Sequence, residues 1–204
     1  MVRLAISERR DLLIAAAWRL MAREGVAAAT TRAICAEAHM PQSSFHYCFA
    51  TRADLLRIVV TSRMPDFITL SANAIEAART PTDRIRSALE AWWQDVLANP
   101  QTQAVMFDIT VHAHYDPDLR DLGTYQYAEA HATVLALLNY AIRDGQYAWD
   151  TDIEQLAVSV VAFLDGLSLR YMVEPHNNSF SAALDTFAAE LSAHLTAVQT
   201  AASV

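Results

Sequence analysis

The stretch TTRAICAEAHMPQSSFHYCFATRADLL, residues 30–56, decides the fold of this chain. It reads as two short helices joined by a tight turn and followed by the start of a third. Ile34, Cys35 and Ala38 fall on one face of the first helix at helical spacing. Pro41 ends that helix, because the residue before a proline is pushed out of the α region, and it suits the first turn of the next helix. The spacing therefore predicts a helix-turn-helix.

The second short helix, expected over 42–49, has two different sides. Phe45 and Phe49 lie on one side, where they can pack against the other helices. The opposite side carries groups that donate and accept hydrogen bonds, namely Gln42, Ser43, His46 and Tyr47. A helix with one apolar and one hydrogen-bonding side can pack on its neighbours and present its polar side outward.

These residues resemble the DNA-binding segment of the TetR family of bacterial transcriptional regulators, which typically runs T-x-R-x-I/L-A-x-x-A-G-V-S-x-x-x-L/F-Y-x-x-F-x-x-K-x-x-L. The positions that fit this spacing without a gap are Thr30, Thr31, Arg32, Ile34, Ala38, Phe45, Phe49, Arg52 and Leu55. Three positions depart from the pattern: His39 replaces the turn glycine, Pro41 stands where serine is usual, and His46 replaces a phosphate-binding tyrosine. A positive φ at the turn costs a non-glycine residue about 1 kcal/mol.

The expected interface with double-stranded DNA follows from this placement. Arg32, near the start of its helix, can reach a base edge or a phosphate, and Arg52 is expected to clamp the DNA backbone. The side chains expected to contact DNA are Thr31, Arg32, Gln42, Ser43, Ser44, His46, Tyr47 and Arg52. Taken singly, each polar residue is better explained as a solvated surface side chain, but the match over the whole stretch favours contact.

The rest of the chain also predicts helices. Of the 204 residues 53% are hydrophobic, and four glycines and six prolines are too few for a turn-rich all-β protein. We expect an all-α fold of about nine helices, with a helix-turn-helix domain over 1–50 and, by resemblance, a helical effector-binding and dimerisation domain over 51–204. Beyond the two short helices, the expected ones are 7–24, 52–78 with a break at Pro65, 82–98, 101–114, 117–144, 151–173 and 178–198.

The net charge of −8 hides an asymmetry along the chain. Residues 1–63 carry nine arginines and five acidic residues, whereas residues 64–204 carry six arginines and eighteen acidic residues. A basic head on an acidic body is typical of a DNA-binding domain attached to a region that does not bind DNA. Variation of surface charge between segments explains the same counts equally well.

The N-terminus runs straight into an amphipathic pattern and shows no apolar run typical of a signal peptide. We find no apolar stretch of about 18 residues that would predict a membrane span, so we expect a cytoplasmic protein without membrane contact. Cys35 and Cys48 both fall in the helix-turn-helix, where packed thiols are expected rather than a disulfide or a redox switch.

Two long apolar helices end the chain. The side chains of 153–172 are apolar on more than one side, and 178–198 repeats the theme, so both need burial on most sides. In the TetR family the last two helices pair with their copies in a second subunit, and the resemblance implies a homodimer of this kind. Two recognition helices about 34–36 Å apart would also read successive major grooves of a palindromic operator. The alternative is burial of 153–172 within one subunit.

Aromatic and methionine side chains gather in the middle of the chain, and most of them are explained by packing of a bundle core. By resemblance, several lie on helices that surround the effector cavity of the family. The residues expected to contact a small-molecule effector are Trp93, Met106, Phe107, Tyr127 and Phe163. Asp108 and His112 lie four residues apart on one helix face, but no third ligand stands at a recognisable spacing, so we expect neither metal nor cofactor.

The sequence carries no G-x-S-x-G, P-loop or H-E-x-x-H signature, so we do not expect an enzyme. The resemblance implies a transcriptional repressor that is released from its operator when a small-molecule effector binds. Such release requires the effector to bind the DNA-incompetent arrangement better than the competent one. The alternative is a helical small-molecule-binding or interaction protein whose DNA binding is impaired by the three departures from the family pattern.

Overall fold

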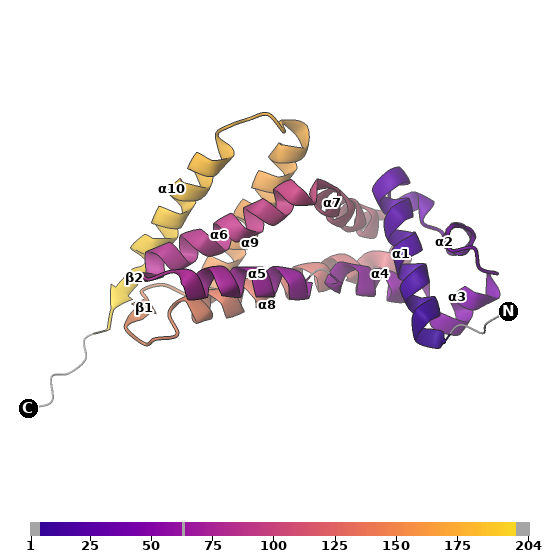
Figure 1. Ribbon diagram of the computed structural model, residues 1–204, viewed down its shortest axis with the longest axis horizontal. Coiled ribbons are helices and arrows are strands. Elements are labelled where there is room, and N and C mark those ends of the chain that lie inside the picture. Colours follow the sequence, from indigo (N-terminus) through magenta and orange to yellow (C-terminus); the bar gives the residue numbers. More distant parts are fainter. Residues whose placement is uncertain (1–4, 63, 199–204) are drawn as a thin grey trace, which may run out of the picture. The chain divides into compact units, whose positions relative to one another are not determined.

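The computed structural model describes residues 5–62 and 64–198, which form ten α-helices, two short 3-10 helices and two short strands (Figure 1). The chain divides into two compact units. The head unit contains the chain up to Met64 together with Gln101–Ala128, and the body unit contains Pro65–Pro100 and the chain from Glu129 onward. The packing units therefore differ from the expected regions 1–50 and 51–204, which stay a prediction about functional domains.

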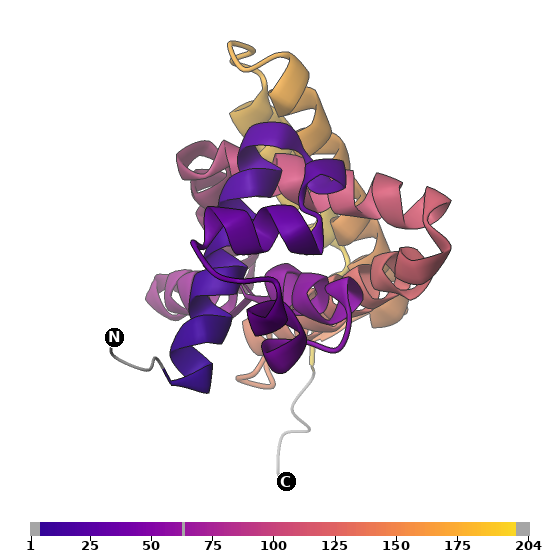
Figure 2. The ribbon, with the colours of Figure 1, turned by 90° about the vertical axis from the view of Figure 1, so that its right-hand side faces the viewer.

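The head unit is built on the predicted helix-turn-helix (Figure 2). Its elements are α1 (Ile6–Glu24), η1 (Val26–Ala28), α2 (Thr31–Glu37), α3 (Ser43–Cys48), α4 (Arg52–Thr61), α7 (Pro100–Tyr115), η2 (Pro117–Leu119) and the first part of α8 (Arg120–Ala141). The apolar faces of these helices meet in one core, in which Leu13, Ile34, Phe45 and Leu55 are fully buried. Burial of a side chain of this size contributes about 1.5–3 kcal/mol.

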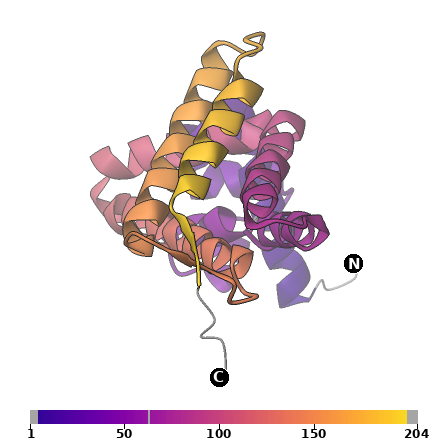
Figure 3. The ribbon, with the colours of Figure 1, turned by 90° about the vertical axis from the view of Figure 1, so that its left-hand side faces the viewer.

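The body unit packs the remaining helices around a second core. Its elements are α5 (Met64–Ala77), α6 (Pro81–Ala98), the rest of α8, β1 (Tyr147–Trp149), α9 (Ile153–Val173), α10 (Phe180–Ala193) and β2 (Leu195–Ala197). Helix α10 packs against α6 and α9 (Figure 3). In its core the ring of Trp93 lies 5.2 Å from that of Tyr171 and 5.3 Å from that of Phe180, measured between centroids.

Several helix ends differ from the sequence prediction. The stretch 117–144 begins as η2 and its α-helix ends at Ala141, and two further differences change the elements themselves. The stretch 52–78 forms two helices, since α4 ends at Thr61 and α5 begins at Met64, which places Pro65 in a first turn where its missing N–H costs nothing. The stretch 178–198 ends its helix at Ala193, and Thr196 of β2 then pairs with Ala148 of β1 in an antiparallel ladder. That pairing joins segments far apart in sequence, so periodicity did not indicate it.

Helix α9 corrects the expectation that the chain has no apolar stretch long enough to span a membrane. By length and composition alone it qualifies as a membrane span, because an 18-residue window has a mean hydropathy of 1.6. Isolated charged residues do not lower that average enough to disqualify it. Only 39% of the window is buried within the chain. A helix in a core or in an interface passes the same test of length and composition. Burial within the chain does not account for the exposed apolar side chains of α9, so these need an explanation other than the core.

Candidate nucleic-acid interface and ligand pocket

The turn between α2 and α3 is closed by a Schellman motif around His39. The N–H of His39 donates to the carbonyl of Ala36 (3.0 Å), and the N–H of Met40 donates to the carbonyl of Cys35 (2.8 Å). His39 has a φ of 54° and is the only non-glycine residue with a positive φ in the described ranges 5–62 and 64–198. The structure thus confirms that a histidine occupies a position where glycine would be unstrained.

We expect His39→Gly to raise the free energy of unfolding by up to about 1 kcal/mol, since glycine removes the positive-φ penalty but loses more backbone entropy on folding. Chemical denaturation measures this change. The control is Ala38→Gly, one residue earlier at a φ of −82°, which should lower stability by a similar amount. A loss of stability in His39→Gly would contradict the prediction.

The outward sides of α2 and α3 present the polar residues expected to contact DNA. Arg32, Gln42, Ser43, His46 and Tyr47 are exposed, and Thr31 and Ser44 are half-buried. The side chain of Arg32 has no hydrogen bond or ion pair within the described part of the chain, so its guanidinium is available to an outside partner. The contact of each of these residues with DNA stays a prediction.

The inner side of α3 is held by α1. Phe45 is fully buried, and its ring centroid lies 5.4 Å from that of Phe49. Nη1 of Arg10 donates to the carbonyl of Cys48 at the end of α3 (2.8 Å), and its guanidinium carbon lies 4.6 Å from the ring centroid of Phe49. Arg9 lies 5.9 Å from the ring centroid of the exposed Tyr47. These contacts fix the orientation in which α3 presents its polar side.

A second set of contacts joins α1 to α2. Nε of Arg19 donates to Glu37 (2.9 Å), and Nη2 of Arg23 donates to the other carboxylate oxygen (3.2 Å). The hydrogen bond from Arg19 has the largest effect on the pKa of Glu37, which it lowers, and the hydrogen bond from Arg23 lowers it further. Because both arginines are exposed, solvent screens the pairs and they contribute little to stability. They do occupy two arginines that would otherwise be available to phosphates.

Arg52 makes contacts within the head unit that the sequence did not predict. Its Nε donates to the carbonyl of Ala29 (2.9 Å), Nη2 donates to the carbonyl of Val26, and Nη1 lies 3.9 Å from the carboxylate of Asp116. The side chain is 21% exposed, and burial lowers the pKa of Arg52 while Asp116 acts against that shift. The guanidinium is thus engaged inside the head unit, and the expected clamp of Arg52 on the DNA backbone stays a prediction.

Sequence reasoning also missed the importance of Asp108. Its carboxylate accepts the backbone N–H of Val26, in the same segment that Arg52 contacts. Gly25, which precedes Val26, has a φ of 84°, and a Cβ added to Gly25 would lie 3.1 Å from Oδ2 of Asp108. Residues from α4 and α7 therefore hold the segment that leads into α2. Within the described ranges, no three His, Cys, Asp or Glu side chains are grouped closely enough for a metal ion.

The body unit contains an apolar pocket that opens to solvent. Its walls come from α5, α6, α8, α9 and α10, and they include Phe67, Ile75, Trp92, Leu138 and Leu164. A concave, mostly apolar space of this kind is the usual form of a small-molecule site. It lies entirely within one compact unit, so its shape does not depend on how the units are arranged.

None of the residues predicted to contact an effector is among those that line this pocket. Trp93 is buried in the body core, where its neighbour Trp92 faces the pocket instead, and Phe163 stacks on Phe187 at 3.9 Å between centroids. The other three, Met106, Phe107 and Tyr127, belong to the head unit. The pattern of aromatic residues indicated the helices but not which face of each helix surrounds the pocket.

Known proteins match this chain over nearly all of its described length. Residues 13–59 match the model of bacterial regulatory proteins of the tetR family, and residues 81–196 match the model of the BetI-type transcriptional repressor C-terminal region. The nicotine-responsive transcriptional repressor HdnoR of Paenarthrobacter nicotinovorans is 22% identical over 174 residues, which cover 85% of this chain and 89% of that protein.

Solved structures show the same fold. A TetR-family regulator from Rhodococcus sp. matches with a TM-score of 0.76 at 20% identity, covering 91% of this chain and 98% of the other. A transcriptional regulator from Saccharomonospora viridis in complex with choline matches with a TM-score of 0.64 at 19% identity, covering 95% and 100%. With its helix-turn-helix and its two family matches, the chain belongs to the TetR family and is a DNA-binding transcriptional regulator.

Proposed function

We propose that the protein is a homodimeric repressor that binds a palindromic operator in the cytoplasm and leaves it when a small molecule enters the pocket of the body unit. The observation that carries the DNA-binding part is the exposed polar side of α2 and α3. The other described arginines of α1–α4 contact groups inside the head, whereas Arg32 stands free on this side. Phosphate contacts would position such a head, and base contacts would specify its site.

The pocket supports the effector part of the proposal. One relative is named as nicotine-responsive and one structural neighbour holds choline, so small organic molecules act on or bind to proteins of this kind. The pocket of this chain is built by five helices, and a ligand there would contact all of them. Release follows only if the ligand binds better to the arrangement that does not fit DNA, and a coupling of about 1–3 kcal/mol is typical.

The exposed stripe of α9 supports a dimer. Val158, Leu169 and Val173 are 59%, 53% and 77% exposed, although they lie on an otherwise apolar helix. Between them, a Cβ added to Gly166 would meet no atom within 4 Å, so another backbone has room to approach. Exposed apolar side chains at helical spacing mark an interaction surface. We therefore assign this stripe, with the neighbouring α10, to contact with a second copy.

Operator binding tests the proposed function. We expect the purified protein to bind a fluorescent duplex from its own upstream region and not a scrambled duplex, as measured by anisotropy. Across a salt series the log–log slope should be about −0.9 per phosphate neutralised. If no duplex from a genome-wide selection of bound fragments is preferred over the scrambled control, the alternative of a helical binding protein with impaired DNA binding is favoured.

A further inference from the structure

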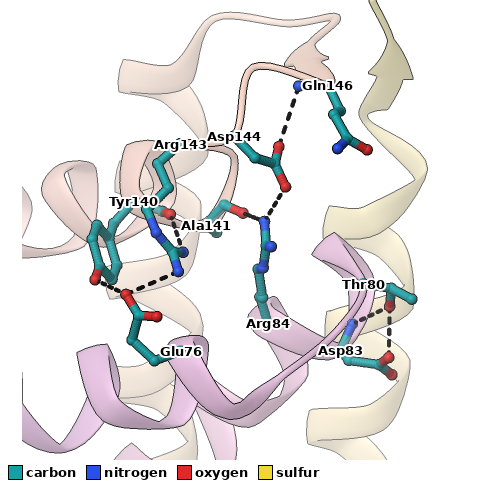
Figure 4. A network of polar contacts seen from close by, with 9 residues as sticks. All are labelled: Glu76, Thr80, Asp83, Arg84, Tyr140, Ala141, Arg143, Asp144 and Gln146. Carbon is teal, nitrogen blue, oxygen red and sulfur yellow. Dashed lines mark hydrogen bonds and ion pairs between the residues drawn. The ribbon is translucent and has the colours of Figure 1, made fainter.

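Two walls of the pocket in the body unit are joined by one arginine that is not part of the lining (Figure 4). Nη1 of Arg84, on α6, donates to the backbone carbonyl of Ala141, the last residue of α8 (2.9 Å). Ala141 lines the pocket, and so does Ile85, which follows Arg84 on α6. The contact therefore ties the wall that α6 provides to the wall that α8 provides.

The carbonyl that Arg84 contacts is one that helix geometry leaves without a partner in its own helix. The last four carbonyl groups of an α-helix accept no N–H from that helix, and a cation at this end also stabilises the helix dipole. Helix α8 ends at Ala141. Because Arg84 belongs to α6, its hydrogen bond to this carbonyl exists only while α6 lies beside the end of α8.

An acidic residue just beyond α8 fixes the position of the Arg84 guanidinium. Nη1 also donates to one carboxylate oxygen of Asp144 (2.7 Å), and the other oxygen accepts the backbone N–H of Gln146 (3.2 Å). The hydrogen bond from Arg84 has the largest effect on the pKa of Asp144, which it lowers, so the carboxylate is ionised at neutral pH. The side chain of Arg84 is 12% exposed, so solvent screens this pair less than a surface pair.

A second link joins α5 to the same end of α8. Glu76, which follows the lining residue Ile75 on α5, accepts a hydrogen bond from the hydroxyl of Tyr140. Its carboxylate also pairs with Nη2 of Arg143 (2.9 Å), whose guanidinium carbon lies 4.2 Å from the ring centroid of Tyr140. Figure 4 shows both links at the end of α8, and of the two the Arg84 link reaches the backbone of a lining residue.

We propose that Arg84 is a positioning residue of the pocket, which holds α8 at a fixed distance from α6 through Ala141 and thereby sets the width of ligand that the pocket accepts. The proposal deepens the proposed function and rests on the pocket as the effector site. The side chains that line the pocket are apolar, and contact with apolar groups has no preferred direction. Selection among ligands in such a space depends on how well their shape fits between the walls.

The test compares two neutral alcohols of different width, octan-1-ol and adamantan-1-ol, as competitors of the fluorescent apolar probe N-phenyl-1-naphthylamine. Loss of probe fluorescence in the presence of the full chain gives a dissociation constant for each alcohol. Arg84→Met keeps an apolar stem but removes both hydrogen bonds. We expect the preference for octan-1-ol over adamantan-1-ol to fall at least about 3-fold, because the walls are no longer held in place for the narrower ligand.

Three further variants show whether this effect belongs to the link. Arg84→Lys should keep most of the wild-type preference, because both hydrogen bonds come from one nitrogen atom. Asp144→Ala, which removes the partner that fixes the guanidinium, should change the preference in the same direction as Arg84→Met. Arg86→Met should leave it unchanged, since Arg86 on the same helix is 49% exposed and its pair with Asp185 is screened by solvent.

The ratio of the two affinities separates positioning from a general loss of stability, which would weaken both alcohols alike. The pocket-filling variant Ala88→Phe, with its fold checked by circular dichroism, should no longer bind the probe. An unchanged ratio in both Arg84→Met and Asp144→Ala, or an equal change in Arg86→Met, would overturn the positioning role.

The same measurements distinguish this role from the proposed function. If the ratio changes as expected but neither alcohol releases the operator duplex, the positioning role stands and the effector role in the proposed function loses its support. If the wild type does not bind the probe, or if Ala88→Phe still binds it, the pocket is not an apolar ligand site and both proposals fail.

Discussion

Arg52→Ala is expected to lower the free energy of unfolding by about 2–4 kcal/mol, because it removes two charge-assisted hydrogen bonds from a half-buried side chain. The variant removes the side-chain donor from the carbonyls of Ala29 and Val26, of which Val26 keeps the N–H of Ala29. It also leaves Asp116 without the nearby cation. Chemical denaturation measures the total loss, and amide hydrogen exchange should show the largest loss of protection in η1 and α2.

The matched control for this prediction is Arg32→Ala, which removes the same side chain from an exposed position. Its stability should stay within about 0.5 kcal/mol of the wild type. Its affinity for operator DNA should fall, and the salt slope should decrease in magnitude by about one if Arg32 binds a phosphate. The opposite pattern, with Arg52→Ala changing the salt slope and leaving stability intact, would support the phosphate clamp and contradict a mainly structural role of Arg52.

Val158→Arg is expected to convert the proposed dimer into monomers and to lower operator affinity by at least about 100-fold. In a twofold interface each substitution appears twice, so two unpaired charges would have to be buried, at a cost of several kcal/mol. Loss of the dimer also removes the gain from binding two half-sites with one molecule, which is commonly 10²- to 10⁴-fold. Sedimentation velocity measures the assembly state, and anisotropy measures the affinity.

Val111→Arg is the control for this interface. Val111 on α7 is 58% exposed, nearly the same as the 59% of Val158, but it belongs to the head unit and not to α9 or α10. We expect it to keep the wild-type assembly state. Dimers in Val158→Arg, or monomers in Val111→Arg alone, would place the subunit contact elsewhere.

The helix-turn-helix was predictable because its signals are local. Ile34 and Phe45 repeat at helical spacing with their apolar neighbours, and both are fully buried. The resemblance to the family pattern, in which glycine stands at the turn, also indicated the positive φ at His39. Periodicity and turn chemistry act over one or two helical turns, and these are the distances that a sequence pattern reports.

The pocket and the internal role of Arg52 were not predictable in this way. Trp92 and Trp93 are neighbouring residues of the same type, yet Trp92 lines the pocket and Trp93 lies in the core. Which of them faces the cavity depends on how α6 is rotated against helices from distant parts of the chain. The partners of Arg52 are likewise set by packing, since Ala29 and Asp116 are far from it in sequence.

By itself the sequence determined the all-helical fold, the helix-turn-helix and the family to which the chain belongs, because each of these depends on local spacing of apolar, polar and turn-forming residues. Tertiary structure alone decided the lining of the pocket, the contact of Arg84 with Ala141 and the inward turn of Arg52. These features arise where faces of separate helices meet, and the periodicity of one helix does not specify the rotation of its neighbours.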